Sequence, residues 1–253
     1  IREFMDLDHD AKYIFGRKRK KKYINQSDGV IYVSNSVANH VNMGEPLKEW
    51  QRVIYNGVDT VDWEYSDKNI PEELNLGVVG IFDPEKGQDV AIGMMPSILK
   101  CYPKAKLHVW GDKEGKYKKR LYSMVNQMGL EENVIFHGFE KNPNIIYKDM
   151  DILMMCSRSE GFGRVTVEAM QRAIPVLGYK SGGTSELVKD GFNGYSFLTQ
   201  EDCVCGLKKM LSSEMEFNKL RKNAYDDART NYTVDLYCSR VEAFVEMIMK
   251  KNE

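Results

Sequence analysis

Two glutamates separated by a glycine-rich turn are the residues in this sequence best suited to chemistry. Glu160 and Glu168 stand eight positions apart, and Gly161-Phe162-Gly163 directly follows the first of them. Glycines let backbone N–H groups approach an anion, and the first turn of a helix offers unpaired N–H donors with a partial positive charge. A carboxylate repels phosphate but accepts hydrogen bonds from neutral hydroxyls. The pattern therefore predicts a phosphate pocket flanked by a sugar and a ribose.

The segments around the turn place it at the edge of a sheet. Asp151 to Cys156 forms an apolar run typical of a buried parallel strand, residues 164–173 fit a helix, and residues 174–179 fit the next buried strand. The turn then lies at the carboxyl end of a strand and opens a helix, which is where open α/β sheets bind ligands. The alternative is a solvated loop and a surface glutamate, the commoner case for a lone Glu.

Residues 157–197 resemble the donor-binding half of the family 4 glycosyltransferases, which are retaining enzymes with the two-domain GT-B architecture. The shared residues occur in the family's order, namely Ser157, Glu160-Gly161-Phe162-Gly163, Glu168-Ala169-Met170, Pro175-Val176, Gly182-Gly183, Glu186 and Gly191-Phe192-Asn193-Gly194. Two glutamates at this spacing are a weak signal by themselves, whereas the whole ordered set is a strong one.

The resemblance implies a role for each site residue. Glu160, the candidate catalytic residue, would contact hydroxyls of the donor sugar, and Glu168 would bind the ribose. Lys86 would neutralise the donor phosphates as a point charge, because GT-B enzymes generally need no bound metal. The remaining expected donor-binding residues are Gly80, Phe139, Gly161, Phe162, Gly163, Arg164 and Val165. No cofactor is expected besides the substrate, a nucleoside-diphosphate sugar, with UDP favoured over GDP.

One position departs from the family pattern. Many members carry an Arg directly after the glycine that precedes the Lys86 loop, and this chain has Ile81 there. Arg164 is a candidate replacement, although a solvated arginine fits equally well.

The histidines predict no metal site. His137 ends a strand near where the family seats the nucleotide base, and ordinary packing is the favoured interpretation of its side chain. His9, His40 and His108 form no cluster with metal-ligand spacing.

Strand and helix patterns alternate through the middle of the chain. The expected strands are 76–81, 106–110, 134–137, 151–156 and 174–179, and the expected helices are 88–99, 116–128, 144–148 and 164–173. Repeated units of this length predict an α/β fold with a doubly wound, Rossmann-like parallel sheet, as in the C-terminal domain of a GT-B enzyme.

The two ends of the chain are expected to form separate pieces. Residues 1–59, with a helix over 10–27, strands 30–33 and 52–55 and a helix over 36–43, fit the tail end of an N-terminal acceptor domain, which normally takes on the order of 150 residues. Residues 60–74 fit an interdomain linker, 75–230 the nucleotide-sugar-binding domain, and 231–253 a helix that crosses back. On that helix Tyr237, Val241, Phe244, Val245 and Ile248 recur at helical spacing. We therefore expect a C-terminal portion that binds nucleotide weakly and is inactive alone.

Composition limits the partners and the compartment. A net charge of −1 gives no general case for binding nucleic acid. The five cysteines lack paired metal-ligand spacing and suit a reducing cytosol, with Cys203-Val204-Cys205 expected as buried helix packing. No apolar run approaches the roughly 18 residues of a membrane-spanning helix.

A run of six basic residues, Arg17 to Lys22, allows two interpretations. A solvated helix end is slightly favoured over attraction to anionic lipid. The expected location is cytoplasmic, with the inner face of the membrane as the second option.

The resemblance implies a retaining hexosyltransferase. It would move a sugar from a nucleoside-diphosphate donor to a saccharide or lipid-linked acceptor, in cell-surface polysaccharide synthesis. A nucleotide-sugar epimerase and a non-catalytic nucleotide-sugar-binding partner are the alternatives on the same fold. Product formation without an acceptor would identify the epimerase, and unchanged affinity in Glu168→Ala and Lys86→Ala would remove the proposed binding site.

Overall fold

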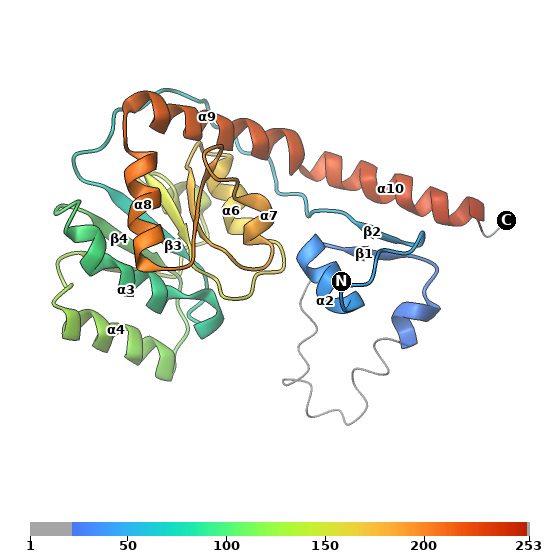
Figure 1. Cartoon of the computed structure of the whole chain (residues 1–253), viewed down its shortest axis with the longest axis horizontal. Coiled ribbons are helices and arrows are strands. Elements are labelled where there is room, and N and C mark those ends of the chain that lie inside the picture. The colour runs from blue at the N-terminus through green and yellow to red at the C-terminus, as the bar shows by residue number, and fades with distance from the viewer. Residues whose placement is uncertain (1–21, 252–253) are drawn as a thin grey trace.

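A computed structural model describes residues 22–251, and a parallel sheet lies inside the larger of its two parts (Figure 1). Within those residues this sheet has six strands in the order β5-β4-β3-β6-β7-β8. The strands are β3 (Asn75–Val79), β4 (Lys106–Trp110), β5 (Val134–Gly138), β6 (Ile152–Met155), β7 (Val176–Tyr179) and β8 (Gly194–Phe197). Counted from β3 this is the order 3-2-1-4-5-6, which confirms the predicted doubly wound, Rossmann-like sheet.

Helices cover both faces of the sheet because side chains alternate along each strand. Leu76, Leu107 and Ile152 pack under α3 (Gln88–Leu99), α4 (Lys116–Met128) and α8 (Gln200–Met210). Leu153 and Val176 pack on the opposite face against α6 (Arg164–Met170), with α7 (Thr184–Leu187) on the same side (Figure 1).

Most predicted boundaries hold to within about two residues, but α6 is shorter than expected. It ends at Met170 rather than Ala173, because Ala173 adopts a left-handed backbone with φ of 58°. In α8, Cys203 is buried as predicted, but Cys205 is exposed, so the prediction of buried packing is wrong for that residue.

Residues 60–74, here called the strap, contain neither helix nor strand and run along α9 (Glu214–Asn231). Three α9 side chains at four-residue spacing hold the strap by its carbonyls. Arg221 donates to Ser66 O at 2.8 Å, Tyr225 to Trp63 O at 2.9 Å, and Arg229 to Val61 O at 3.0 Å. Residues four apart share one face of a helix, so α9 fixes the strap along its length.

The N-terminal segment, residues 22–59, contains a short helix over 22–26, β1 (Val30–Tyr32), α2 (Asn35–Asn42) and β2 (Gln51–Val53). β1 and β2 pair in parallel. The predicted helix over 10–27 lies mostly outside the described residues. Val58 forms an isolated bridge with Thr233, where the chain also leaves α9 for the last helix.

The last helix, α10 (Val234–Lys251), extends beside β1 and β2 (Figure 1). The Phe244 ring lies against Gly29 and 5.8 Å from the Arg52 guanidinium, and Lys251 pairs with Glu49. Of the predicted apolar stripe only Phe244 is buried among these described residues, and Val245 is 46% exposed. The predicted helix is confirmed, and Tyr237, Val241 and Ile248 are half-buried on it.

Candidate functional site

The site lies where the strand order reverses, between β3 and β6. The loop that leaves β3 carries Lys86, and the loop that leaves β6 carries Glu160. The Lys86 Nζ donates to Glu160 Oε2 at 2.8 Å, and the two side chains are 34% and 15% exposed. The structure thus brings together two predicted site residues at the crevice where sheets of this type bind ligands.

A glycine allows these two loops to meet. A 3₁₀ turn (Pro84–Lys86) is followed by Gly87, which has a left-handed backbone with φ of 69°. A Cβ atom on Gly87 would lie 2.0 Å from Cys156 O. Gln88 fixes the start of the same loop by donating to Gly80 O at 3.1 Å and Ile81 O at 3.0 Å.

An ion pair that sequence reasoning missed joins the first turn of α3, directly after the Lys86 loop, to the loop that carries Glu160. Asp89 receives hydrogen bonds from Arg158 at 3.0 and 3.1 Å and from the Tyr117 hydroxyl at 2.9 Å. Burial opposes the charged form of Asp89, but the bonds from Arg158 and Tyr117 outweigh it and lower the pKa of the carboxyl. The position of Arg158, two residues before Glu160, was the available signal in the sequence.

A second pair of glycines supports the turn that follows Glu160. Gly183 N donates to Glu160 O at 2.6 Å. A Cβ atom on Gly182 would lie 2.5 Å from Glu160 O, and one on Gly183 would lie 2.6 Å from Gly161 O. Gly163, with φ of 94°, then opens α6. The glycines of the motif therefore bring two backbone segments into direct contact behind Glu160.

Phe162 has its ring inside the protein. It is 4% exposed, stacks on Tyr55 at 5.9 Å between ring centroids, and meets Tyr232 edge-on at 5.9 Å. The backbone of Phe162 is therefore the part that a ligand can reach.

Glu168 is oriented by a buried tyrosine. The Tyr147 hydroxyl donates to Glu168 Oε2 at 3.0 Å. Burial, and secondly the charge of Glu168, raise the pKa of Tyr147 well above its ordinary value, so this hydroxyl stays protonated. Arg164 lies 3.7 Å from Glu168 Oε1 with its side chain 63% exposed, and Val165 is half-buried beside it. The Tyr147 hydroxyl thus fixes the position of the Glu168 carboxylate, and the accessible Arg164 guanidinium lies beside it.

A small cavity of about 160 Å³ opens beyond Gly80, at the carboxyl ends of β3, β4 and β5. Its lining is mainly apolar, and it includes the predicted residues Gly80 and Phe139 together with Ile81, Trp110 and Glu140. Phe139 is 71% exposed and Ile81 is 52% exposed. Ile81 thus places an apolar side chain in this lining, where the family resemblance leads us to expect a cation.

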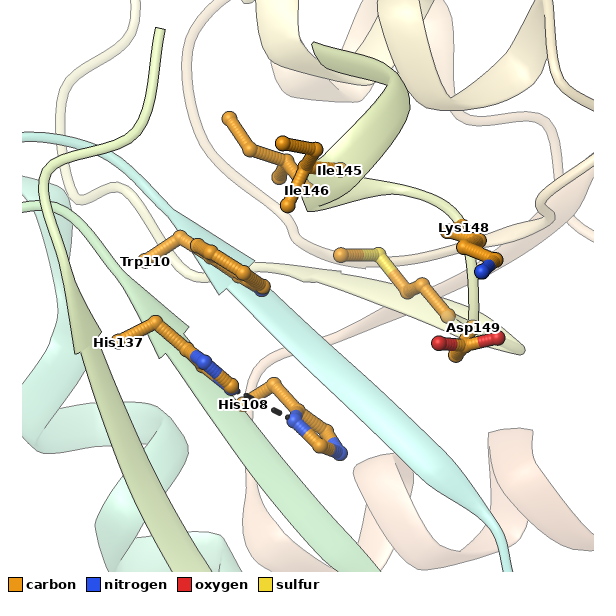
Figure 2. A pocket seen from close by; sticks show the side chains of 8 residues that line it. His108, Trp110, His137, Ile145, Ile146, Lys148 and Asp149 are labelled. Atoms are coloured by element: carbon orange, nitrogen blue, oxygen red, sulfur yellow. Dashed lines mark hydrogen bonds between the residues drawn. The ribbon is translucent and has the colours of Figure 1, made fainter. Parts of the chain in front are cut away.

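A neighbouring pocket of about 330 Å³ contains a stack of three rings (Figure 2). His137 lies 3.9 Å from Trp110, ring centroid to centroid, and its Nε2 is 2.8 Å from His108 Nδ1. Desolvation lowers the pKa of both histidines, although Asp149 opposes the shift at His108. Trp110 also lines the smaller cavity. Sequence reasoning missed this contact between His108 and His137.

Two further expectations concern metals and membranes. Among residues 22–251, no group of three or more His, Cys, Asp and Glu side chains could hold a metal ion. In the same residues no helix is both long and apolar enough to span a bilayer. Arg17 to Lys21 lie outside the described residues, and Lys22 is exposed, so contact of this run with lipid stays a prediction.

A parallel sheet in this order, with glycine turns and charged side chains at its switch point, defines a Rossmann-like domain of the kind found in GT-B glycosyltransferases. The chain belongs to the family of glycosyl transferases group 1, whose model matches residues 63–228.

Three known proteins illustrate the relationship. The chain is 32% identical over 219 residues to an uncharacterized glycosyltransferase of Methanocaldococcus jannaschii, covering 85% of this chain and 58% of that protein. It is 26% identical over 249 residues to the lipopolysaccharide core biosynthesis mannosyltransferase LpsB of Rhizobium meliloti. That match covers 91% of this chain and 68% of LpsB. The structure of HepE of Anabaena, in complex with UDP and glucose, matches with a TM-score of 0.84 and 22% sequence identity. That match covers 97% of this chain and 70% of the HepE chain. The chain therefore spans 58% of the length of the first relative.

Proposed function

We propose that this chain forms the nucleotide-sugar-binding part of a family 4, retaining glycosyltransferase. The reaction would move a hexose from a nucleoside-diphosphate donor to a saccharide or lipid-linked acceptor. The observation that carries the proposal is the Lys86–Glu160 pair across the switch point, with Glu168 held by Tyr147 behind it. LpsB acts in lipopolysaccharide core biosynthesis, which supports a role in cell-surface polysaccharide synthesis.

The proposed chemistry follows from the donors that remain available. An ammonium carries three N–H donors, and Glu160 uses one of those on Lys86, so two can bind phosphate oxygens. Lys86 and the backbone of Gly161–Gly163 then stabilise the departing diphosphate. Arg164 supplies the second cation in place of the arginine that the family resemblance leads us to expect at the position of Ile81. Glu160 and Glu168 accept hydrogen bonds from the sugar and ribose hydroxyls.

The proposed nucleotide is UDP. HepE was solved with UDP, and the cavity of about 160 Å³ beside Gly80 would hold the base. The apolar faces of Ile81 and Phe139 would contact the base.

Calorimetric titration of UDP and GDP into this chain tests the proposal. Lys86→Ala and Glu168→Ala should each weaken UDP binding about tenfold, which corresponds to about 1.4 kcal/mol. Lys219→Ala is the matched control, because Lys219 pairs with Glu216 on α9. Equal UDP affinity in all four proteins would remove the site, and tighter binding of GDP would overturn the choice of base.

A further inference from the structure

Glu186, in α7, joins the main domain to the N-terminal segment. Its Oε2 accepts hydrogen bonds from Asn35 N and Nδ2, both at 2.9 Å, and from the Tyr55 hydroxyl at 2.8 Å. Its Oε1 accepts from Ser36 N at 2.7 Å. These donors lie 131 to 151 residues away in the sequence. One half-buried carboxylate thus receives four bonds from the same distant segment, counted among the described residues.

The donors are well matched to a negative charge. Asn35 and Ser36 are the first two residues of α2, whose N–H groups have no partner within their own helix. A carboxylate there is stabilised by the helix dipole, and hydrogen bonds to a charged group are roughly twice as strong as neutral ones. Burial would raise the pKa of Glu186, but the bonds from Ser36, Asn35 and Tyr55 outweigh it and lower the pKa.

Two routes connect this contact to the turn that carries Glu160. Gly183, three residues before Glu186, donates to Glu160 O at 2.6 Å. Tyr55, which donates to Glu186, also stacks on Phe162 with ring centroids 5.9 Å apart. The N-terminal segment therefore touches the glutamate turn through a charged hydrogen-bond set and a ring stack that share Tyr55.

We propose that Glu186 is a positioning residue that seats the N-terminal segment on the glutamate turn and so fixes where that segment lies beside Glu160. The importance of this placement rests on the proposed function, in which Glu160 faces the donor sugar. The contact itself does not depend on that function. Glu186 acts through Asn35, Ser36 and Tyr55 rather than on the substrate.

Amide hydrogen exchange of the full chain, read residue by residue, tests the proposal. Glu186→Gln should speed exchange at Asn35 and Ser36 by about tenfold or more and leave the β3, β4 and β6 amides unchanged. It should also weaken the nuclear Overhauser contact between the Tyr55 and Phe162 rings, which a general loss of stability would not do selectively. Tyr55→Phe should have a smaller effect on the two amides, because three of the four bonds remain.

Two controls make the outcomes distinguishable. Glu216→Gln, which removes a carboxylate that pairs with Lys219 on α9, should leave exchange at Asn35 and Ser36 unchanged. Unchanged exchange at both amides in Glu186→Gln, or uniformly faster exchange across the sheet, would overturn the proposal. UDP affinity should stay within about twofold in all variants. Failure of the parent chain to bind UDP would instead overturn the proposed function and leave the exchange result standing.

Discussion

Arg158 holds Asp89 with both terminal nitrogens, Nη1 to Oδ1 at 3.0 Å and Nη2 to Oδ2 at 3.1 Å. Asp89 follows Lys86 by three residues and Arg158 precedes Glu160 by two, so this planar pair fixes the spacing of the two loops that carry the site.

Replacing Asp89 with Asn should therefore affect both stability and binding. We expect the free energy of unfolding to fall by about 1–2 kcal/mol, because the variant loses charge-assisted bonds while Arg158 can still reach water. UDP affinity should fall as well, since the loops lose their fixed spacing. Urea unfolding and calorimetry measure the two effects. Asp226→Asn, which breaks the exposed pair with Lys222, should change stability by less than about 0.5 kcal/mol. Equal losses of stability and of UDP affinity in the two variants would show that Asp89 does not fix the spacing of the two loops.

Two glycines with nearly the same backbone angle should respond very differently to alanine. Gly87 has φ of 69° and Gly129 has φ of 65°, but a Cβ on Gly87 would lie 2.0 Å from Cys156 O, whereas one on Gly129 meets nothing within 4 Å. Gly129→Ala should cost about 1–2 kcal/mol from backbone strain alone. Gly87→Ala should cost about 3 kcal/mol or more, because the two loops must separate. Urea denaturation compares them, and similar unfolding midpoints would show that the loops do not touch.

Removing the Tyr147 hydroxyl should impair Glu168 without breaking the fold. In Tyr147→Phe, Glu168 loses its 3.0 Å donor, so we expect UDP affinity to fall about threefold to tenfold and stability to fall by about 1 kcal/mol. Tyr65→Phe is the matched control, because the Tyr65 hydroxyl also donates to a carboxylate, that of Asp67 on the strap. It should lose similar stability while keeping its UDP affinity. Unchanged affinity in Tyr147→Phe would contradict a ribose-binding role for an oriented Glu168.

The ring stack predicts how stability varies with pH. His108 and His137 have pKa values lowered in the folded protein, while unfolded histidine titrates near about 6.5. The unfolded chain therefore binds more protons below that pH. The contribution of the neutral pair is fully present above the unfolded pKa and is lost as pH falls through it toward the lower folded values.

Urea unfolding between pH 5 and pH 8 should show this loss in the parent chain and a shallower loss in His137→Gln. A parent slope retained in His137→Gln would rule out the pair as the source of the pH dependence.

The sheet and its ligand edge follow from local signals in the sequence. Apolar runs and glycine punctuation define β3, α3, β4 and α4, and Gly129 ends α4 in a left-handed conformation as its position predicts. The motif and the strand ends predict Glu160, Lys86 and Glu168 at one edge, and the structure places Lys86 against Glu160 there.

The missed contacts join residues that have no local relationship. Arg158 and Asp89 are 69 residues apart, and only the closeness of the β3 and β6 loops brings them together. His108 and His137 are 29 residues apart and become neighbours through the register of β4 and β5, which shifts at Trp110. Neither the alternation of side chains within a strand nor a sequence motif predicts the register between β4 and β5. The lengths of α8 and α9 were likewise not predicted from the mixed polar pattern after residue 199.

The isolated bridge between Val58 and Thr233 marks the place where the chain crosses between the two parts of the structure. Within the described residues the chain leaves the N-terminal segment for the main domain after residue 59, and it returns beside that segment with α10. Both crossings meet here, where Val58 N donates to Tyr232 O at 2.8 Å. Gly57 lies so close to Val234 that a Cβ would be 2.5 Å from its Cα. Both crossings therefore share one point of attachment, and a side chain at Gly57 would push the two segments apart there.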